Sequence, residues 1–313
     1  MKVFINFKKG FQASSQTFKM IFMLFLINFF ISLILGFPML GTLKSSLGSS
    51  IAGEKMAKGF DYLWWQEFRD ESQGLALTFR PSIINQGAIL DNVEYLVEMR
   101  FFQLPLAVLI LILIYIVIHT FLAGGLLAIF NQDEIKFTLK KFFGGAGQYF
   151  FRFLLLMAIS WVFFLAIGFF LNKGFNSLIS RIAAKSLTEI QPFYAGLLFK
   201  GVILFLLLFT HMVFDYARIK IVVEDSKNVL TSALKSFGFV AKHLGSTLGL
   251  YFILIGLSIV TAILYIALKS LIPQANLAPV AIAFLIQQAF ILAIIWLRCW
   301  LYSSQLELYR YLK

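Results

Sequence analysis

Four ionisable side chains stand inside long apolar stretches of this sequence or at their ends, where a charge or a titratable group is costly. They are His119, His211, Asp215 and Arg218. An ionisable residue at membrane depth is a functional hypothesis, because it must be paired or hydrated there. Three kinds of chemistry fit these residues: a histidine that ligates a tetrapyrrole, an acid that binds a proton or a cation, and a structural hydrogen bond between helices.

The two histidines could bind haem iron, but their positions disfavour one shared haem. At ~1.5 Å per residue, His119 lies about 16 Å and His211 about 6 Å from the same side of the membrane, a mismatch of about 10 Å. A separate tetrapyrrole on either histidine stays open. The simpler interpretation, which we favour, is a neutral imidazole that is hydrogen-bonded to a neighbouring helix. We therefore predict no cofactor.

Asp215 and Arg218 are three residues apart, so they share a helix face and can pair. A transport function would use Asp215 as a proton or cation site, with His211 one turn away. The structural interpretation, which we favour, is a neutralised helix end, where Arg218 can also contact a lipid phosphate. Lys200, near the other end of the same stretch, is interpreted as a snorkelling lysine that keeps its ammonium at the interface.

These residues belong to six stretches that are nearly free of charge. The chain has 313 residues, of which 60% are hydrophobic and 13% are charged, whereas a soluble domain has about 25% charged residues. Each stretch can cross a hydrocarbon core of ~30 Å as a helix, and none alternates as a barrel strand would. We predict an all-α membrane protein with spans near 20–41, 104–130, 150–172, 194–215, 246–269 and 278–301.

The basic residues predict the orientation. One side holds both termini and the 131–149 and 216–245 segments, and with the flanking Arg152 and Arg298 it carries 16 Lys and Arg. The opposite side carries 9, balanced by 9 Asp and Glu. The positive-inside rule places the first side, with both termini, in the cytoplasm. Topology thus explains the net charge of +12, and we expect no nucleic-acid partner, since no groove-reading element accompanies it.

The order of elements predicts three hairpins of two spans, each preceded by a cytoplasmic amphipathic helix. The three amphipathic segments are 7–18, 137–149 and 227–244, and each combines basic with apolar side chains. This pattern is typical of helices that lie in the interface plane. The repetition fits an internal duplication, as in many transporters, but stacked hairpins give the same order without one, and we favour the second explanation.

The outer loop, residues 42–103, is the only sizeable segment outside the predicted membrane. Its aromatic pair Trp64 and Trp65 suits a membrane interface. The neighbouring Asp61 and Glu67 could contact a partner, although such carboxylates lack the spacing of a calcium loop. We expect a small cap of short helices there, with these four residues on a partner-binding surface.

Two stretches support a resemblance. Asp215-Tyr-Ala-Arg-Ile-Lys-Ile-Val-Val-Glu-Asp225, followed by Ser232-Ala-Leu-Lys-Ser-Phe-Gly-Phe-Val-Ala-Lys-His243, resembles a segment of uncharacterised bacterial six-span membrane proteins, and Gly-Phe-Asp-Tyr-Leu-Trp-Trp-Gln-Glu-Phe at 59–68 fits the same group. The layout is distantly similar to the membrane domain that precedes some glycerophosphodiester phosphodiesterases. The resemblance implies a protein of the bacterial inner membrane and no reaction, because the metal-binding carboxylates of the phosphodiesterase domain are absent from this sequence.

No sequence motif indicates a reaction. The phosphate-loop, His-Glu-x-x-His and Gly-x-Ser-x-Gly patterns do not occur, the three histidines are dispersed, and the single Cys299 cannot form an internal disulfide. We therefore do not expect an enzyme. Few intramembrane charges favour a non-enzymatic accessory or scaffold subunit, with lipid and other subunits as partners through the spans or the 42–103 loop. The alternative is a transporter or channel for a small or lipid-like substrate, which a cavity containing Asp215, His211 or His119 would favour.

Overall fold

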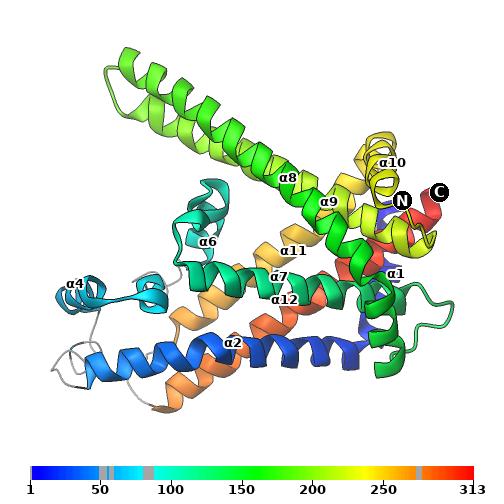
Figure 1. The fold of residues 1–313 in the computed structure, drawn as a ribbon, viewed down its shortest axis with the longest axis horizontal. Coiled ribbons are helices and arrows are strands. Elements are labelled where there is room, and N and C mark those ends of the chain that lie inside the picture. The colour runs from blue at the N-terminus through cyan, green and yellow to red at the C-terminus, as the bar shows by residue number, and fades with distance from the viewer. Residues whose placement is uncertain (1, 49–54, 56–59, 80–87, 273–276) are drawn as a thin grey trace.

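The computed structural model describes residues 2–48, 55, 60–79, 88–272 and 277–313, and all regular structure within these ranges is helical. Six of the described helices are long and apolar enough to cross a membrane, which makes the chain an integral membrane protein of several spans. They form a bundle that is closed at the end with both termini and diverges at the other (Figure 1). The six are α2 (Phe18–Leu47), α7 (Leu106–Phe130), α8 (Leu139–Lys185), α9 (Ile190–Val223), α11 (Leu244–Ser270) and α12 (Leu277–Leu312).

Each predicted span corresponds to one of these helices, although α7 begins two residues later than predicted and α8 is longer than predicted. It runs for 47 residues without a break, so the segment 137–149 supplies its first turns instead of a separate amphipathic helix. No proline interrupts this stretch, and its glycines keep their backbone hydrogen bonds, so the helix continues. The Thr138 side chain caps its start by accepting a hydrogen bond from the Lys141 amide at 3.3 Å.

Two short helices, α1 (Lys2–Gln16) and α10 (Val229–Lys242), lie at the end with the termini (Figure 1). Both turn small or polar residues toward the protein. Gly10 of α1 contacts the backbone of Ser304 on α12, while Ser232 of α10 is fully buried. Large apolar residues of α10 such as Leu234 are exposed. This distribution is the reverse of a soluble protein and suits surroundings of lipid.

Glycines permit a close approach between α7 and α8. A Cβ added at Gly125 would stand 2.6 Å from the carbonyl oxygen of Phe142, and one at Gly145 would overlap the Ala128 side chain. Small residues permit such contact between backbones in membranes. Helix α8 also packs along α9, and α11 along α12. A Cβ added at Gly201 would have nothing within 4 Å, so this glycine makes no close approach among the described residues.

Burial divides the bundle into two halves. Within the described part of the chain, long segments at the divergent end, such as 25–47 and 278–296, contain no buried residue. We call this end the splayed half, and it comprises residues 25–47, 106–118, 162–202, 255–270 and 278–296. The other end, the packed half, holds the main apolar core and comprises residues 13–24, 120–130, 142–157, 203–223, 229–254 and 297–309.

Short helices of the 42–103 segment form a small cap beside the splayed half. Residues 49–54, 56–59 and 80–87 of this segment lie outside the described residues, as do 273–276 of the 270–277 connection. The cap comprises α4 (Tyr62–Glu71), a 3₁₀ turn (Gly74–Thr78), α6 (Ala88–Val97) and a second 3₁₀ turn (Arg100–Gln103).

The cap corrects part of the predicted partner surface. Trp64 is buried against Phe68 and Phe79, because its large apolar ring supplies most of the core that such a small cap can form. Its indole N–H donates a hydrogen bond to the Ser46 hydroxyl at 3.1 Å. The Asp61 carboxylate caps α4 by accepting from the amides of residues 63 and 64. Trp65 is half-buried and Glu67 is exposed.

Candidate functional site

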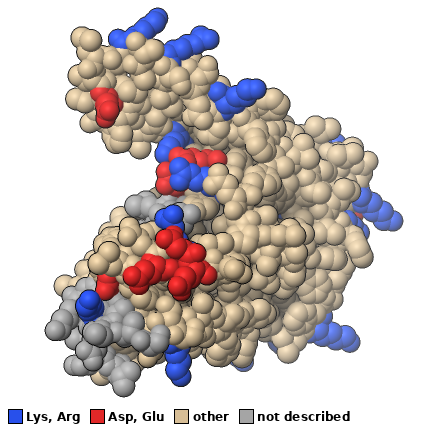
Figure 2. All heavy atoms as spheres, turned by 60° about the vertical axis from the view of Figure 1, so that its left-hand side comes forward, with Lys and Arg blue, Asp and Glu red and all other residues tan. Residues whose placement is uncertain are grey.

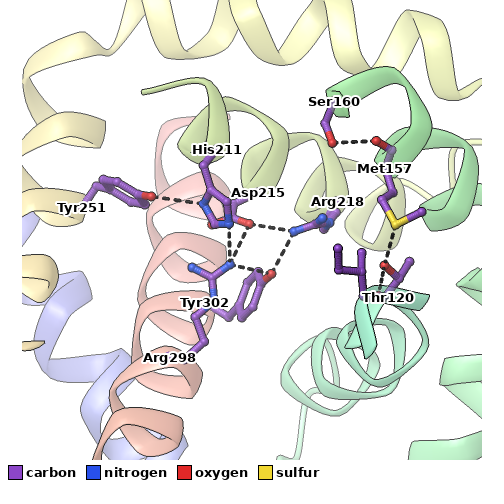
Figure 3. Close-up of polar contacts among 10 residues, drawn as sticks. Thr120, Met157, Ser160, His211, Asp215, Arg218, Tyr251, Arg298 and Tyr302 are labelled. Atoms are coloured by element: carbon purple, nitrogen blue, oxygen red, sulfur yellow. Dashed lines mark hydrogen bonds and ion pairs between the residues drawn. The ribbon is translucent and has the colours of Figure 1, made fainter. Parts of the chain in front are cut away.

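Helices α9 and α12 meet at a cluster of charged and phenolic side chains (Figure 3). On α9, His211, Asp215 and Arg218 follow one another at the spacing of one helix face. On α12, Arg298 and Tyr302 are one turn apart and point toward them. The five side chains thus come from two helices, and the residues of one helix lie at least 80 positions of the chain from those of the other, as Arg218 does from Arg298.

The Asp215 carboxylate is the centre of this cluster and is fully buried. Its Oδ1 accepts hydrogen bonds from Arg218 Nη1 at 3.0 Å and from Arg298 Nη2 at 3.2 Å. The Tyr302 hydroxyl accepts from the same two groups at 3.1 and 2.9 Å. One carboxylate therefore faces two guanidinium groups, and a buried carboxylate is tolerable because it is paired in this way.

The contacts of His211 define its tautomer. Its Nε2 lies 3.2 Å from Arg298 Nη2, and a guanidinium can only donate, so we assign Nε2 as an unprotonated acceptor. Nδ1 then carries the hydrogen, which faces the Tyr251 hydroxyl at 3.1 Å and Asp215 Oδ2 at 3.3 Å. In this assignment the imidazole is neutral, and both of its ring nitrogens have partners.

A cavity of about 470 Å³ lies where the packed half meets the splayed half, within the ~300–1,000 Å³ of small-molecule sites. His211, Arg218, Arg298 and Tyr302 form one polar part of its wall. A second polar group is Asn28, whose Oδ1 lies 3.1 Å from both His119 Nε2 and the Tyr115 hydroxyl. The rest of the wall is mainly apolar and includes Leu122, Ala123, Leu126, Met157, Phe164 and Leu204.

The predicted intramembrane residues take two positions relative to the cavity. His119, His211 and Arg218 line the same cavity, although the two histidines do not contact each other. Asp215 lies behind the arginines and is not part of the wall. Because both guanidinium groups hold it, Asp215 is a partner for cations of the protein itself, not an empty proton or cation site.

Lys200 is not simply snorkelling. Its ammonium pairs with Glu98 at 2.5 Å and with Glu94 at 3.2 Å, which joins α9 to the cap. Partial burial opposes ionisation of Glu98, but the hydrogen bond and charge of Lys200 lower its pKa below the ordinary value. Figure 2 shows acidic and basic side chains gathered in a hollow of the divergent end, and Figure 1 shows α8 and α9 projecting from the bundle there as an arm.

A further ionic cluster closes the packed half at the C-terminus. The Glu224 carboxylate accepts hydrogen bonds from Lys220 at 2.6 Å and from Tyr309 at 2.7 Å, and Lys313 lies 3.0 Å away. Partial burial raises the pKa of Glu224, but these three donors outweigh it and lower the pKa to about 2. The end of α12 is thereby fastened to the end of α9.

A tetrapyrrole would have to compete with contacts that the histidines of the site already make. The described residues contain no group of three His, Cys, Asp or Glu side chains that could hold a metal ion. A tetrapyrrole on His211 would have to displace Arg298 or Tyr251 from its ring nitrogens, whereas on His119 it would displace Asn28. The arrangement instead offers hydrogen-bond donors and positive charge to whatever enters the cavity.

Arg298, Tyr302, Tyr251 and Asn28 are site residues that the sequence interpretation missed. Arg298 had been assigned to the positive flank of the last span, and the three others are uncharged. The sequence did contain a pattern that could have identified two of them. Arg298 and Tyr302 are one helical turn apart, near the end of the last span that lies at the same membrane depth as Asp215.

No family model, curated protein or solved structure matches this chain, so a functional proposal must start from the cavity and its side chains.

Proposed function

We propose that this membrane protein is a transporter that binds a lipid-like substrate within the bilayer. The observation that carries the proposal is the cavity between the helices, with His119 and His211 in its wall. A mainly apolar wall suits acyl chains or similar groups, because an ion would need several polar ligands in place of its hydration shell. The two separate polar groups of the wall suit a substrate with a polar end.

Helix divergence supports access to this cavity from the membrane. Helices α8 and α9 pack along each other but point away from α2 and α12 at the open end (Figure 1). Large apolar side chains of the splayed half, such as Phe170 and Leu198, are exposed and suit contact with lipid. A substrate dissolved in the bilayer could therefore reach the cavity without crossing water.

The accessory-subunit hypothesis depends on the small number of intramembrane charges, which a lipid-like substrate explains equally well. The cavity therefore shifts our proposal to transport. The orientation remains part of the proposal: both termini in the cytoplasm of a bacterial cell, with the chain in the inner membrane. It is supported by the basic excess at the end with the termini.

Transport is tested in liposomes by following the movement of fluorescent phospholipid and fatty-acid probes between leaflets. The matched variants on α7 are Ala123→Trp, which fills the cavity, and Leu113→Trp, at a side chain that is 57% exposed. We expect the wild type and Leu113→Trp to accelerate movement, and Ala123→Trp to reduce it severalfold. Equal rates with wild-type protein and with protein-free liposomes would refute the proposal.

Orientation is tested with an impermeant maleimide in a Cys299→Ser background. A cysteine at Glu67 should react in intact cells, whereas one at Lys8 should react only after the membrane is opened. The opposite order would place the termini outside.

A further inference from the structure

The charges around the cavity do not balance. Asp215 provides one negative charge for the two positive charges of Arg218 and Arg298, while His211 is neutral by its hydrogen bonds. Among the described residues, no second carboxylate contacts either arginine. Because an uncompensated charge away from water is costly, one positive charge at this depth calls for an anion from outside the chain.

The surplus charge faces the cavity, not the protein. Asp215 has an exposed fraction of 0% and lies behind the guanidinium groups, whereas 35% of the Arg298 side chain is exposed at the cavity wall. A ligand in the cavity therefore meets Arg298 and Tyr302 before it meets any carboxylate. The electrostatic barrier that Asp215 would present to an anion is screened by the two arginines.

Arg298 also keeps donors for a ligand. Within the described residues, its hydrogen bonds to His211, Asp215 and Tyr302 all run through Nη2. The remaining N–H groups on Nη1 and Nε form no hydrogen bond there. On Arg218, Nε is buried and likewise has no partner. A planar guanidinium edge with free donors matches two oxygens of a carboxylate or a phosphate.

We propose that the cavity binds an amphiphile with a single anionic headgroup, a carboxylate or a phosphate, which pairs with Arg298. The hydrocarbon chain lies along the apolar wall formed by Leu122, Ala123 and Leu126. This inference rests on the proposed transport of a lipid-like substrate and names the charge of that substrate. His211 and Asp215 act as positioning residues, because they hold the guanidinium through Nη2 and leave Nη1 and Nε for the ligand.

Binding is measured by native mass spectrometry with the full chain in phosphatidylcholine nanodiscs. The probes are dodecyl phosphate, monolauroylglycerol as an uncharged amphiphile of equal chain length, and inorganic phosphate. Since hydrogen bonds to charged groups are the stronger ones, dodecyl phosphate should bind the wild type about tenfold more tightly than monolauroylglycerol. Inorganic phosphate should bind weakly, because it gains nothing from the apolar wall.

Variants then locate the headgroup. Arg298→Gln should remove the preference for dodecyl phosphate and leave monolauroylglycerol unchanged, while Arg298→Lys, which keeps the charge without the fork, should retain part of it. The matched control is Arg310→Gln on the same helix, which should behave as the wild type, because Arg310 pairs with Glu307 and Asn131 outside the cavity. Ala123→Trp should weaken both amphiphiles.

The outcomes separate this inference from the proposed function. Equal binding of both amphiphiles to the wild type, reduced by Ala123→Trp, would overturn the anionic headgroup while supporting a lipid-like substrate. Inorganic phosphate that binds as tightly as dodecyl phosphate would assign a free-anion site and overturn the amphiphile. Binding of no amphiphile would overturn both proposals. The comparison of probes is made on the wild type alone. It therefore tests the proposal even if the Arg298→Gln protein misfolds.

Discussion

The two halves of this bundle contain similar kinds of residue but pack differently. In the packed half, small residues and buried serines bring helices together, and the buried Asp215 carboxylate pairs with two arginines. In the splayed half, equally apolar helices diverge, and their ion pairs, such as Lys200 with Glu94, lie at the surface. Hydropathy thus puts both halves in the membrane, whereas small side chains and buried polar contacts decide which half is closed.

The strongest way to break the packed half is to remove the charge at its centre. Asp215→Asn would leave two guanidinium groups without a counter-ion, and we expect a loss of about 3–5 kcal/mol in the free energy of unfolding. The matched change in the splayed half, Glu94→Gln, should cost about 1 kcal/mol or less, because that pair is exposed. Unfolding by SDS in mixed micelles measures both. Similar losses would mean that the halves do not differ in this respect.

Replacing a glycine with alanine should change stability in opposite directions in the two halves. Gly125→Ala forces a Cβ to within 2.6 Å of the Phe142 carbonyl oxygen, and overpacking of this kind costs about 1–3 kcal/mol. Gly201→Ala meets nothing within 4 Å, and alanine favours a helix over glycine by about 0.8–1 kcal/mol. The first variant should lower the thermal unfolding midpoint in detergent and the second should raise it. A lower midpoint for both would show that α9 is also closely packed at Gly201.

Acid should weaken the ionic cluster around Glu224, which lies at the C-terminal end of the packed half. Glu224 has a pKa of about 2 when folded, against an ordinary value of 4.5. A depressed pKa means that its stabilisation is complete above the ordinary value and is lost as the pH falls from there toward 2. Because the carboxylate is partly solvated, we expect an effect of about 1 kcal/mol. Glu224→Gln should remove this part of the pH dependence, and an unchanged profile would contradict the assignment.

The smallest energetic effect should come with the largest movement. Lys200→Gln removes both ion pairs between α9 and the cap, and exposed pairs contribute about 1 kcal/mol or less. We expect unchanged unfolding but a broader distance distribution between spin labels at Val93 and Leu197, measured by electron paramagnetic resonance. The control Lys242→Gln, on α10, should leave the distribution as it is. A distribution unchanged by Lys200→Gln would show that the arm is held by other contacts.

Much of the fold could be predicted from the sequence, because in lipid a continuous apolar segment can satisfy its own backbone hydrogen bonds only as a helix. The cavity could not be predicted. Its position depends on where helices diverge, which no local pattern records. The pairing of His119 with Asn28 and of Asp215 with Arg298 joins residues 91 and 83 positions apart. In a hydropathy pattern Arg298 appears only as a charge that flanks a span. Asn28, which is uncharged and lies within an apolar run, does not stand out in such a pattern.

The unbroken length of α8 has a mechanical consequence. Its 47 residues extend for about 70 Å at 1.5 Å per residue, more than twice the ~30 Å of a hydrocarbon core. One end is fixed against α7 at Gly145, while the far end contacts mainly α9. Gly145 and the far end at Lys185 are about 60 Å apart at this rise per residue, so a rotation of about 5° at Gly145 would move the far end by about 5 Å. Such a rotation would turn a small adjustment near the cavity into a displacement of about one helical turn at the far end.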